Sequence, residues 1–132
     1  MRSIPLGAKG AYSLVVGPEH LASQFKDAIL PPVFATPMMI LAIENAALNA
    51  IRDYLDPGES AVGTEVSVHH LAPTPVGHRV RAEAEVTAVD GRRVAFAVLA
   101  RDEIEEIGRG THERMVVDLD RLGQRLAAKR KA

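Results

Sequence analysis

The chain has 132 residues, enough for one folded domain with its own core but not for two ordinary ones. Hydrophobic residues make up 47% and charged residues 25%, and 16 basic against 17 acidic residues leave a formal net charge of −1. This balance excludes the overall basic field that nucleic-acid binding requires. The lack of cysteine excludes disulfides, thiolate metal sites and cysteine nucleophiles. We expect one domain over residues 1–132.

Neither the first residues nor the longest apolar run predicts a secretory or membrane location. The first ten residues, MRSIPLGAKG, contain no apolar signal core. The longest apolar run, 33–43, contains Thr36 and Pro37 and is too short to span a bilayer. We expect a cytoplasmic protein with no membrane partner, which also fits the absence of cysteine.

The first elements are a strand and an ambiguous segment. Tyr12, Leu14 and Val16 alternate with smaller or polar neighbours, which predicts a strand ending before Gly17. Residues 19–32 are compatible with a short helix that the two prolines at 31 and 32 would stop.

One long helix is predicted over Pro37–Leu55. Thr36 is expected as its N-cap and Pro37 as its first residue, because this pair commonly begins a helix. Good helix formers follow as far as Leu55, and the turn residues of 56–58 end the element.

After the helix the hydrophobic period changes to two, which indicates strands. Runs around 62–70, 80–88, 94–100 and 106–118 follow one another, and Asp90-Gly91 predicts a hairpin between the middle two. Leu119–Ala132 is expected to form a terminal helix with a basic tail. The order predicts an α+β fold in which a curved five-stranded antiparallel sheet wraps one long central helix, the hot-dog arrangement.

Glu44 interrupts the apolar stripe of this helix. At about 100° per residue, six apolar residues fall within roughly 60° of it: Ile40, Leu41, Ala47, Leu48, Ile51 and Leu55. We therefore expect Glu44 to be buried, where an unpaired carboxylate costs on the order of several kcal/mol. Two explanations stay open: a structural ion pair or hydrogen bond to an inward Arg or His, or a desolvated nucleophile or general base.

His70 has the strand parity of Val66 and Val68, so we expect it to point toward the helix, whereas His69 points to solvent. A single inward histidine is most often a satisfied core residue. If its imidazole meets Glu44, however, the two groups could move protons near neutral pH.

Thr36 needs no function if it is an N-cap, yet a helix N-terminus also suits a developing oxyanion. The eight helical residues between Thr36 and Glu44 correspond to about 12 Å along the axis. Within one straight helix the two side chains cannot act on the same carbonyl. Either the helix starts later and the preceding chain folds back, or Thr36 works with Glu44 of a second subunit, which we favour.

Several segments resemble the fluoroacetyl-CoA thioesterase family of the hot-dog superfamily. They are VFATPMM, AIENAA, YLDPGESAVGTEVSVHHLAPTPVG and DEIEEIGRGTHERMVV, which together extend over about two thirds of the chain without gaps in their spacing. The resemblance implies that Thr36, Glu44 and His70 are catalytic. It also implies that Gly63 and Arg114 lie against the acyl group, although Gly63 could instead mark a bulge and Arg114 could simply pair with an acid.

The resemblance further implies hydrolysis of a small acyl-CoA to free acid and CoA, with Glu44 as nucleophile or as general base. Specialists for fluoroacetyl groups close the site with an aromatic lid before the threonine, and the matching stretch here has Asp27 and Leu30 nearest the lid. A general small acyl-CoA is therefore the expected substrate. A non-catalytic acyl-CoA binding protein and a hot-dog hydratase or dehydratase remain alternatives.

We expect no cofactor apart from the CoA thioester substrate. The five histidines show no metal-ligand spacing, so no metal is assigned. A homodimer with active sites at the subunit interface is expected, because one helix leaves sheet edges and a half-formed cleft that a partner would complete.

Overall fold

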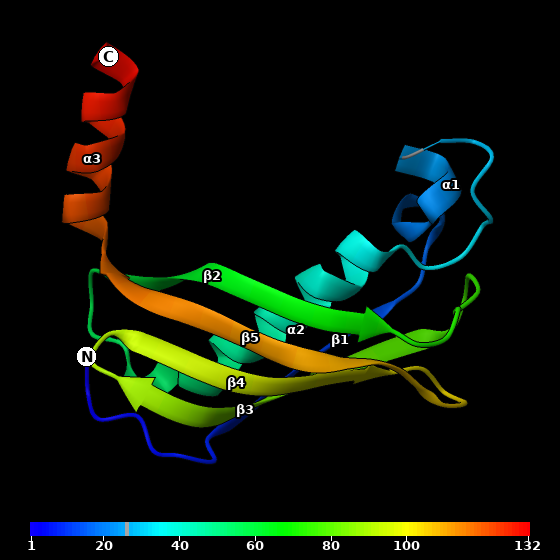
Figure 1. Cartoon of the computed structure of the whole chain (residues 1–132), viewed down its shortest axis with the longest axis horizontal. Coiled ribbons are helices and arrows are strands. Elements are labelled where there is room, and N and C mark those ends of the chain that lie inside the picture. The colour runs from blue at the N-terminus through cyan, green and yellow to red at the C-terminus, as the bar shows by residue number, and fades with distance from the viewer. Residues whose placement is uncertain (26) are drawn as a thin grey trace.

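The computed structural model describes residues 1–25 and 27–132 and has the expected hot-dog architecture. Five antiparallel strands form one sheet in the order β1-β3-β4-β5-β2, which curls around the long helix α2 (Figure 1). The strands are β1 (Lys9–Val15), β2 (Glu59–His70), β3 (Arg79–Asp90), β4 (Arg93–Arg101) and β5 (Glu106–Asp118). The α+β fold class and the hot-dog arrangement predicted from the sequence are confirmed.

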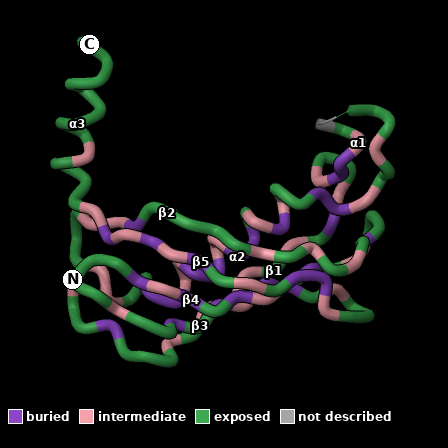
Figure 2. Tube along the Cα trace, in the orientation of Figure 1, coloured by how far each residue is buried: buried purple, intermediate pink, exposed green. Residues whose placement is uncertain are grey.

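Helix α2 (Thr36–Ile51) fills the concave side of the sheet and supplies much of the core. One of its faces is fully covered and consists mainly of small residues, so the helix lies close to the strands, mostly β1 and β3 (Figure 2). The buried residues of this face are Met39, Ala42, Ile43, Ala46, Ala47, Ala50 and Ile51. They meet the inward side chains of the strands, such as Val80, Phe96 and Val116.

The helix differs at both ends from the prediction. Ala35 is the N-cap and Thr36 the first helical residue, one position away from the expected cap. The α-helix ends at Ile51, and a 3₁₀ turn, η2 (Arg52–Tyr54), takes the chain to Leu55. The Leu55 amide closes this turn on the Arg52 carbonyl at 3.3 Å, since the last turn of a helix commonly tightens in this way.

The segment before α2 folds into two short turns, η1 (Pro18–His20) and α1 (Ala22–Phe25), and then doubles back. Leu21 forms a bridge with Phe34, and the Ala35 amide donates to the His20 carbonyl at 2.9 Å. The Phe34 amide donates to the Thr74 carbonyl at 2.9 Å, which joins this segment to the loop after β2. These bonds fix the place at which α2 begins.

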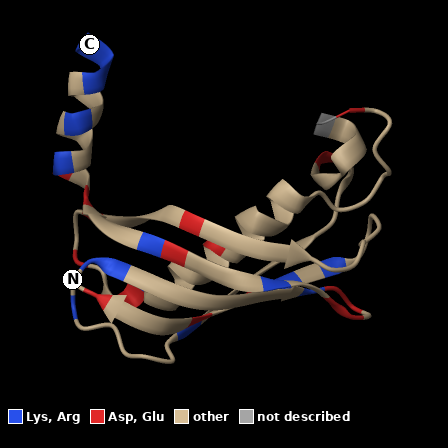
Figure 3. Cartoon of the chain, viewed as in Figure 1, with Lys and Arg blue, Asp and Glu red and all other residues tan. Residues whose placement is uncertain are grey.

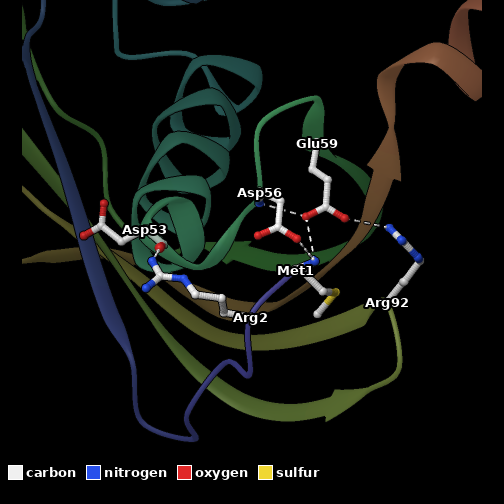
Figure 4. Close-up of polar contacts among 6 residues, drawn as sticks. All are labelled: Met1, Arg2, Asp53, Asp56, Glu59 and Arg92. Atoms are coloured by element: carbon white, nitrogen blue, oxygen red, sulfur yellow. Dashed lines mark hydrogen bonds and ion pairs between the residues drawn. The ribbon is translucent and has the colours of Figure 1, made fainter.

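A group of polar contacts ties the N-terminal segment to the loop between α2 and β2 (Figure 4). The Met1 ammonium lies 2.6 Å from Asp56 and 2.9 Å from Glu59, and Arg92 of the β3–β4 hairpin pairs with Glu59 at 3.2 Å. Hydrogen bonds from the Asp56 amide and from Met1 lower the pKa of Glu59. The guanidinium of Arg2 lies 5.9 Å from the Tyr54 ring centroid.

Helix α3 (Leu119–Lys131) projects away from the sheet at the end of β5 (Figure 1). The Asp118 carboxylate caps it by accepting from the Arg121 amide at 3.0 Å. None of its residues is buried in the described structure, and basic side chains run along its length (Figure 3). In the described part of the chain, no helix combines the length and apolarity needed to cross a membrane.

Strand β2 lies at one edge of the sheet, next to β5 and not next to β3, which follows it in the chain. Its residues 62–67 are all exposed, including Val62 and Val66. The first half of α2 extends past this edge in Figure 1. The strand and the helix therefore leave one apolar side of the protein uncovered.

Gly10 marks the closest approach between β1 and α2, which provides a test of this packing. A Cβ at Gly10 would overlap the backbone nitrogen of Ala50 and the carbonyl oxygen of Ala46, neither of which can move independently of the helix. We expect Gly10→Ala to lower the free energy of unfolding by about 1–3 kcal/mol or more, measured by urea denaturation. Gly123→Ala is the matched control, because a Cβ there meets nothing within 4 Å and should slightly stabilise α3. An unchanged midpoint for Gly10→Ala would contradict the close packing.

Candidate active site

Thr36 and His70 form a hydrogen-bonded pair. Thr36 Oγ1 lies 2.8 Å from His70 Nδ1, so the first residue of α2 meets the last residue of β2. The threonine hydroxyl makes no capping bond to the helix, because the cap position belongs to Ala35. The expectation that Thr36 is the N-cap is thus wrong, and its hydroxyl contacts the imidazole instead. His70 points toward the helix, as the strand parity predicted.

The imidazole of His70 is placed to exchange protons. Burial lowers its pKa, which favours the neutral ring. Its second nitrogen, Nε2, is buried and has no hydrogen-bond partner among residues 1–25 and 27–132. A buried nitrogen without a partner is costly, so a polar group that approaches it from outside the chain would be bound favourably.

The pair lies at the wall of an apolar hollow of about 380 Å³. The lining comes from the segment before α2 and from the loop after β2, and includes Leu30, Val33 and Leu71. Phe34 also lines it, with its ring buried edge-on against His20 at 6.3 Å between centroids. The side chain of Phe25 lies outside the described residues. A small acyl group would fit in such a hollow.

Glu44 lies apart from this pair. Its side chain is 39% exposed and pairs with Arg114, whose Nη1 lies 3.2 Å from Oε2. It borders a second hollow of about 400 Å³, together with Leu41 and Leu48. The expected burial of Glu44 is therefore wrong for this chain. The apolar stripe around Glu44 is the uncovered flank of α2, and the sheet covers the neighbouring face.

Gly63 and Arg114 lie opposite each other in the β2–β5 register and both contact Glu44. A Cβ on Gly63 would lie 2.7 Å from Glu44 Oε2, so only glycine leaves room for this position of the carboxylate. Arg114 also donates from Nη2 to the Ala61 carbonyl at 2.7 Å. Of the two interpretations of Arg114, the structure contains the ion pair with an acid. That acid is Glu44.

His112 belongs to the same group and was not singled out by the sequence. It is buried beside Arg114, with its Nε2 3.2 Å from Arg114 Nη1 and its Nδ1 2.7 Å from the Glu65 carbonyl. Burial is the largest cause that lowers the pKa of His112. Strand parity could have found it, because His112, Arg114 and Val116 alternate on the inward face of β5.

The polar residues therefore form two separate groups in this chain. Thr36 with His70 forms one, and Glu44 with Arg114, Gly63 and His112 forms the other. Because α2 is continuous from Thr36 to Ile51, the helical rise separates Thr36 and Glu44 by about 12 Å. The described residues contain no group of three His, Cys, Asp or Glu side chains that could hold a metal ion.

An antiparallel sheet wrapped around one helix, with a Thr–His pair beside an apolar hollow and an Arg-paired carboxylate on the same helix, is the arrangement expected of a hot-dog thioesterase. The profile of the family described as fluoroacetyl-CoA-specific thioesterase matches residues 16–120. The fluoroacetyl-CoA thioesterase of Streptantibioticus cattleyicolor is 39% identical over 129 residues, which cover 94% of this chain and 93% of that protein. The chain belongs to the fluoroacetyl-CoA thioesterase family, and it is an acyl-CoA thioesterase.

Solved structures agree with this assignment. The structure of the fluoroacetyl-CoA thioesterase FlK has a TM-score of 0.90 and 36% identity, covering 96% of this chain and 98% of its own. A hypothetical protein from Thermus thermophilus, described as a thioesterase superfamily member, reaches 0.91 with 31% identity over 99% and 96% of the two chains. Among the functions left open by the sequence, the relatives favour thioester hydrolysis over hydration or binding without catalysis.

The buried imidazoles predict how stability responds to acid. Because burial lowers the pKa of His70 and His112, the unfolded chain binds more protons than the folded one below about pH 6.5. Stability should therefore fall as the pH decreases through this range, and the fall should be smaller in His70→Asn or His112→Gln. Urea unfolding at pH 7.5, 6.0 and 5.0 measures it, with exposed His69→Gln as the control. Parallel curves for all variants would contradict this assignment.

Proposed function

We propose that the protein hydrolyses a small acyl-CoA in a composite site, in which Thr36 and His70 of one protomer act with Glu44 of a second. The observation that carries this proposal is the Thr36–His70 hydrogen bond of 2.8 Å at the wall of an apolar hollow, with the buried Nε2 of the ring left without a partner in the described chain. Neither of the two polar groups by itself contains all three of the proposed catalytic residues.

The uncovered side of the protomer supports a homodimer. The exposed edge of β2 and the exposed flank of α2 lie side by side, and Leu41, Val62 and Val66 on them are large, apolar and exposed. Exposed apolar edge strands favour pairing with another chain. A two-fold axis near the middle of β2 would pair β2 with its copy and would bring each Glu44 toward the other protomer. We infer that the active sites lie at this interface.

The groups are suited to thioester hydrolysis. Thr36, at the positive end of the α2 dipole, would stabilise the oxyanion formed from the thioester carbonyl. Glu44 would either attack the carbonyl carbon, giving an anhydride that water then cleaves, or remove a proton from water that attacks directly. In both routes the C–S bond breaks with its electron pair going to sulfur, and the sulfur receives one proton of the consumed water by way of His70, which yields CoA. The net reaction consumes one water and releases the acid.

The acyl group is the less defined part of the substrate. A structure of an FlK variant holds fluoroacetate and CoA, which supports a CoA thioester as substrate here. The hollow beside Thr36 is lined by aliphatic Leu30 and Val33 on the side of the expected lid. We infer that small unsubstituted acyl groups are accepted as well as a fluoroacetyl group. A location in the cytoplasm belongs to this proposal, because acyl-CoA has to be available to the enzyme.

Removing the proposed catalytic groups should abolish turnover. We expect Glu44→Gln and His70→Ala each to lower kcat/KM for acetyl-CoA by about 10²–10⁴-fold, the range typical of general acid–base groups, and Thr36→Ala by about 10–10³-fold. Release of CoA thiol from acetyl-, propionyl-, butyryl- and fluoroacetyl-CoA is the measurement. Wild-type rates in Glu44→Gln or His70→Ala would remove the assignment, even if the wild type hydrolyses acyl-CoA.

Mixing two inactive variants tests the composite site. If Thr36 and His70 act with Glu44 of the partner, a heterodimer of His70→Ala and Glu44→Gln protomers regains one intact site. Random reassociation after mild unfolding should then restore about a quarter of the wild-type activity, because half of the dimers are mixed and each has one intact site of two. Mixtures that stay inactive while heterodimers form would place all three residues in one protomer.

A substrate panel tests the acyl hollow. Without an aromatic closure near Leu30, fluoroacetyl-CoA and acetyl-CoA should differ by less than about tenfold in kcat/KM, since small changes in an apolar pocket discriminate weakly. Leu30→Phe should increase the preference for the smallest acyl groups by narrowing the hollow. A preference of several hundredfold for fluoroacetyl-CoA in the wild type would show that other residues close the site.

A further inference from the structure

His112 is buried in the middle of the sheet, where the catalytic assignment gives it no task. Its ring stacks on Phe96 of β4 with 5.9 Å between centroids and an interplanar angle of 24°. Its Cε1 lies beside Gly63 of β2, and both of its nitrogens have partners. A ring that only filled space would not need two polar contacts, and an apolar side chain would serve equally well.

The two partners define the protonation state of the ring. The Glu65 carbonyl can only accept, so Nδ1, 2.7 Å away, must carry a proton and donate it. Arg114 can only donate, so Nε2, 3.2 Å from Nη1, must present a lone pair. The ring is thus the neutral Nδ1–H tautomer. Burial, which lowers the pKa of His112, favours the same neutral form.

This tautomer fixes the guanidinium that faces Glu44. Arg114 Nη1 lies 3.2 Å from both Glu44 Oε2 and His112 Nε2, and Nη2 lies 2.7 Å from the Ala61 carbonyl. The three acceptors come from three elements, α2, β5 and β2, and together they set the plane of the Arg114 guanidinium. Without His112 the guanidinium would keep two of these acceptors and could turn about the Ala61 contact, and the Glu44 carboxylate would turn with it.

We propose that His112 is a positioning residue of the thioesterase, which as the neutral Nδ1–H imidazole holds Arg114 in the orientation that aligns Glu44 with the substrate. The inference rests on the proposed role of Glu44. It assigns no contact between His112 and the substrate. Because a misplacement of about 1 Å can cost on the order of 10²-fold in rate, the effect should appear in kcat and not in KM.

Two substitutions separate positioning from packing. His112→Met fills a similar volume without a strong acceptor, whereas His112→Gln can place its side-chain oxygen near the position of Nε2. We expect His112→Met to lower kcat for acetyl-CoA by about 10–100-fold with KM changed less than about threefold. His112→Gln should recover most of this loss. Equal kcat in the two variants, or a wild-type kcat in His112→Met, would overturn the proposal.

Controls exclude a general loss of structure. His78→Met and His78→Gln make the same changes at a histidine just before β3, which does not neighbour β2 in the sheet, and should leave kcat unchanged. Thermal midpoints of all variants are measured, and the assays are run well below the lowest midpoint. If His112→Met does not fold, the kcat of His112→Gln and the tautomer of the wild-type ring, observed by NMR, still test the proposal.

A double-mutant cycle tests whether His112 acts through Glu44. In the Glu44→Gln background, whose residual rate is measured at high enzyme concentration, adding His112→Met should cause no further loss of kcat. A full additional loss would mean that His112 acts elsewhere, which overturns the inference alone. If Glu44→Gln by itself has wild-type activity, the proposed function fails first, so the two failures are distinguishable.

The tautomer can also be observed directly in the full-length protein. Nitrogen NMR of histidine-labelled protein at pH 7.5 should find His112 neutral, with the proton on Nδ1, assigned by comparison with His112→Gln. A protonated ring or the Nε2–H tautomer would overturn the proposal, because neither can accept a hydrogen bond from Arg114 at Nε2.

Discussion

The close packing of one straight helix inside a curled sheet determines where the functional groups of this protein can lie. Alanines at 42, 46, 47 and 50 of α2 and the missing side chain of Gly10 allow the helix to lie almost directly on the strands. A helix held this way along its length cannot bend to bring Thr36 and Glu44 together. Their axial separation of about 12 Å is therefore built into the fold, and it supports the proposal of a site that takes Thr36 from one copy of the chain and Glu44 from another.

The same packing explains why the polar residues form two groups. His70 ends β2 at the point where α2 begins, so it meets Thr36. Gly63 lies seven residues earlier in the same strand and lines up with Arg114 of β5, at the level of Glu44 on the helix. A strand rises by roughly 3.3 Å per residue and a helix by roughly 1.5 Å per residue. Both Thr36 with His70 and Glu44 with Gly63 still come into contact, because the strand crosses the helix at an angle (Figure 1). Each group is thus aligned by its own set of contacts.

Burial gives the two groups different chemical properties. His70 keeps a buried nitrogen without a partner in the described chain, which suits a group that exchanges a proton during the reaction. His112 has both nitrogens bonded and is held in one tautomer, which suits a residue that orients others. The two histidines are therefore distinguished by what their second nitrogen contacts. A sequence does not contain this information.

The period-two runs after residue 58, the long apolar helix and the Asp90-Gly91 turn were sufficient to predict the α+β class, because hydrophobic periodicity directly reflects which residues face a core. The inward direction of His70 followed from the same parity. The cap at Thr36 and the burial of Glu44 were predicted wrongly. Most positions on α2 are apolar, so the helix has two candidate buried faces, and only the placement of the sheet selects one of them.

The sequence by itself determined the local elements and their inward faces, since these depend on neighbours within a few residues. The tertiary structure alone decided that β2 lies beside β5, that Thr36 bonds to His70, and that Arg114 and His112 hold Glu44. The residues in two of these contacts are 34 and 70 positions apart in the sequence. The others come to lie side by side only when the strands pair. They depend on strand order and register, which long-range packing selects and local patterns do not encode.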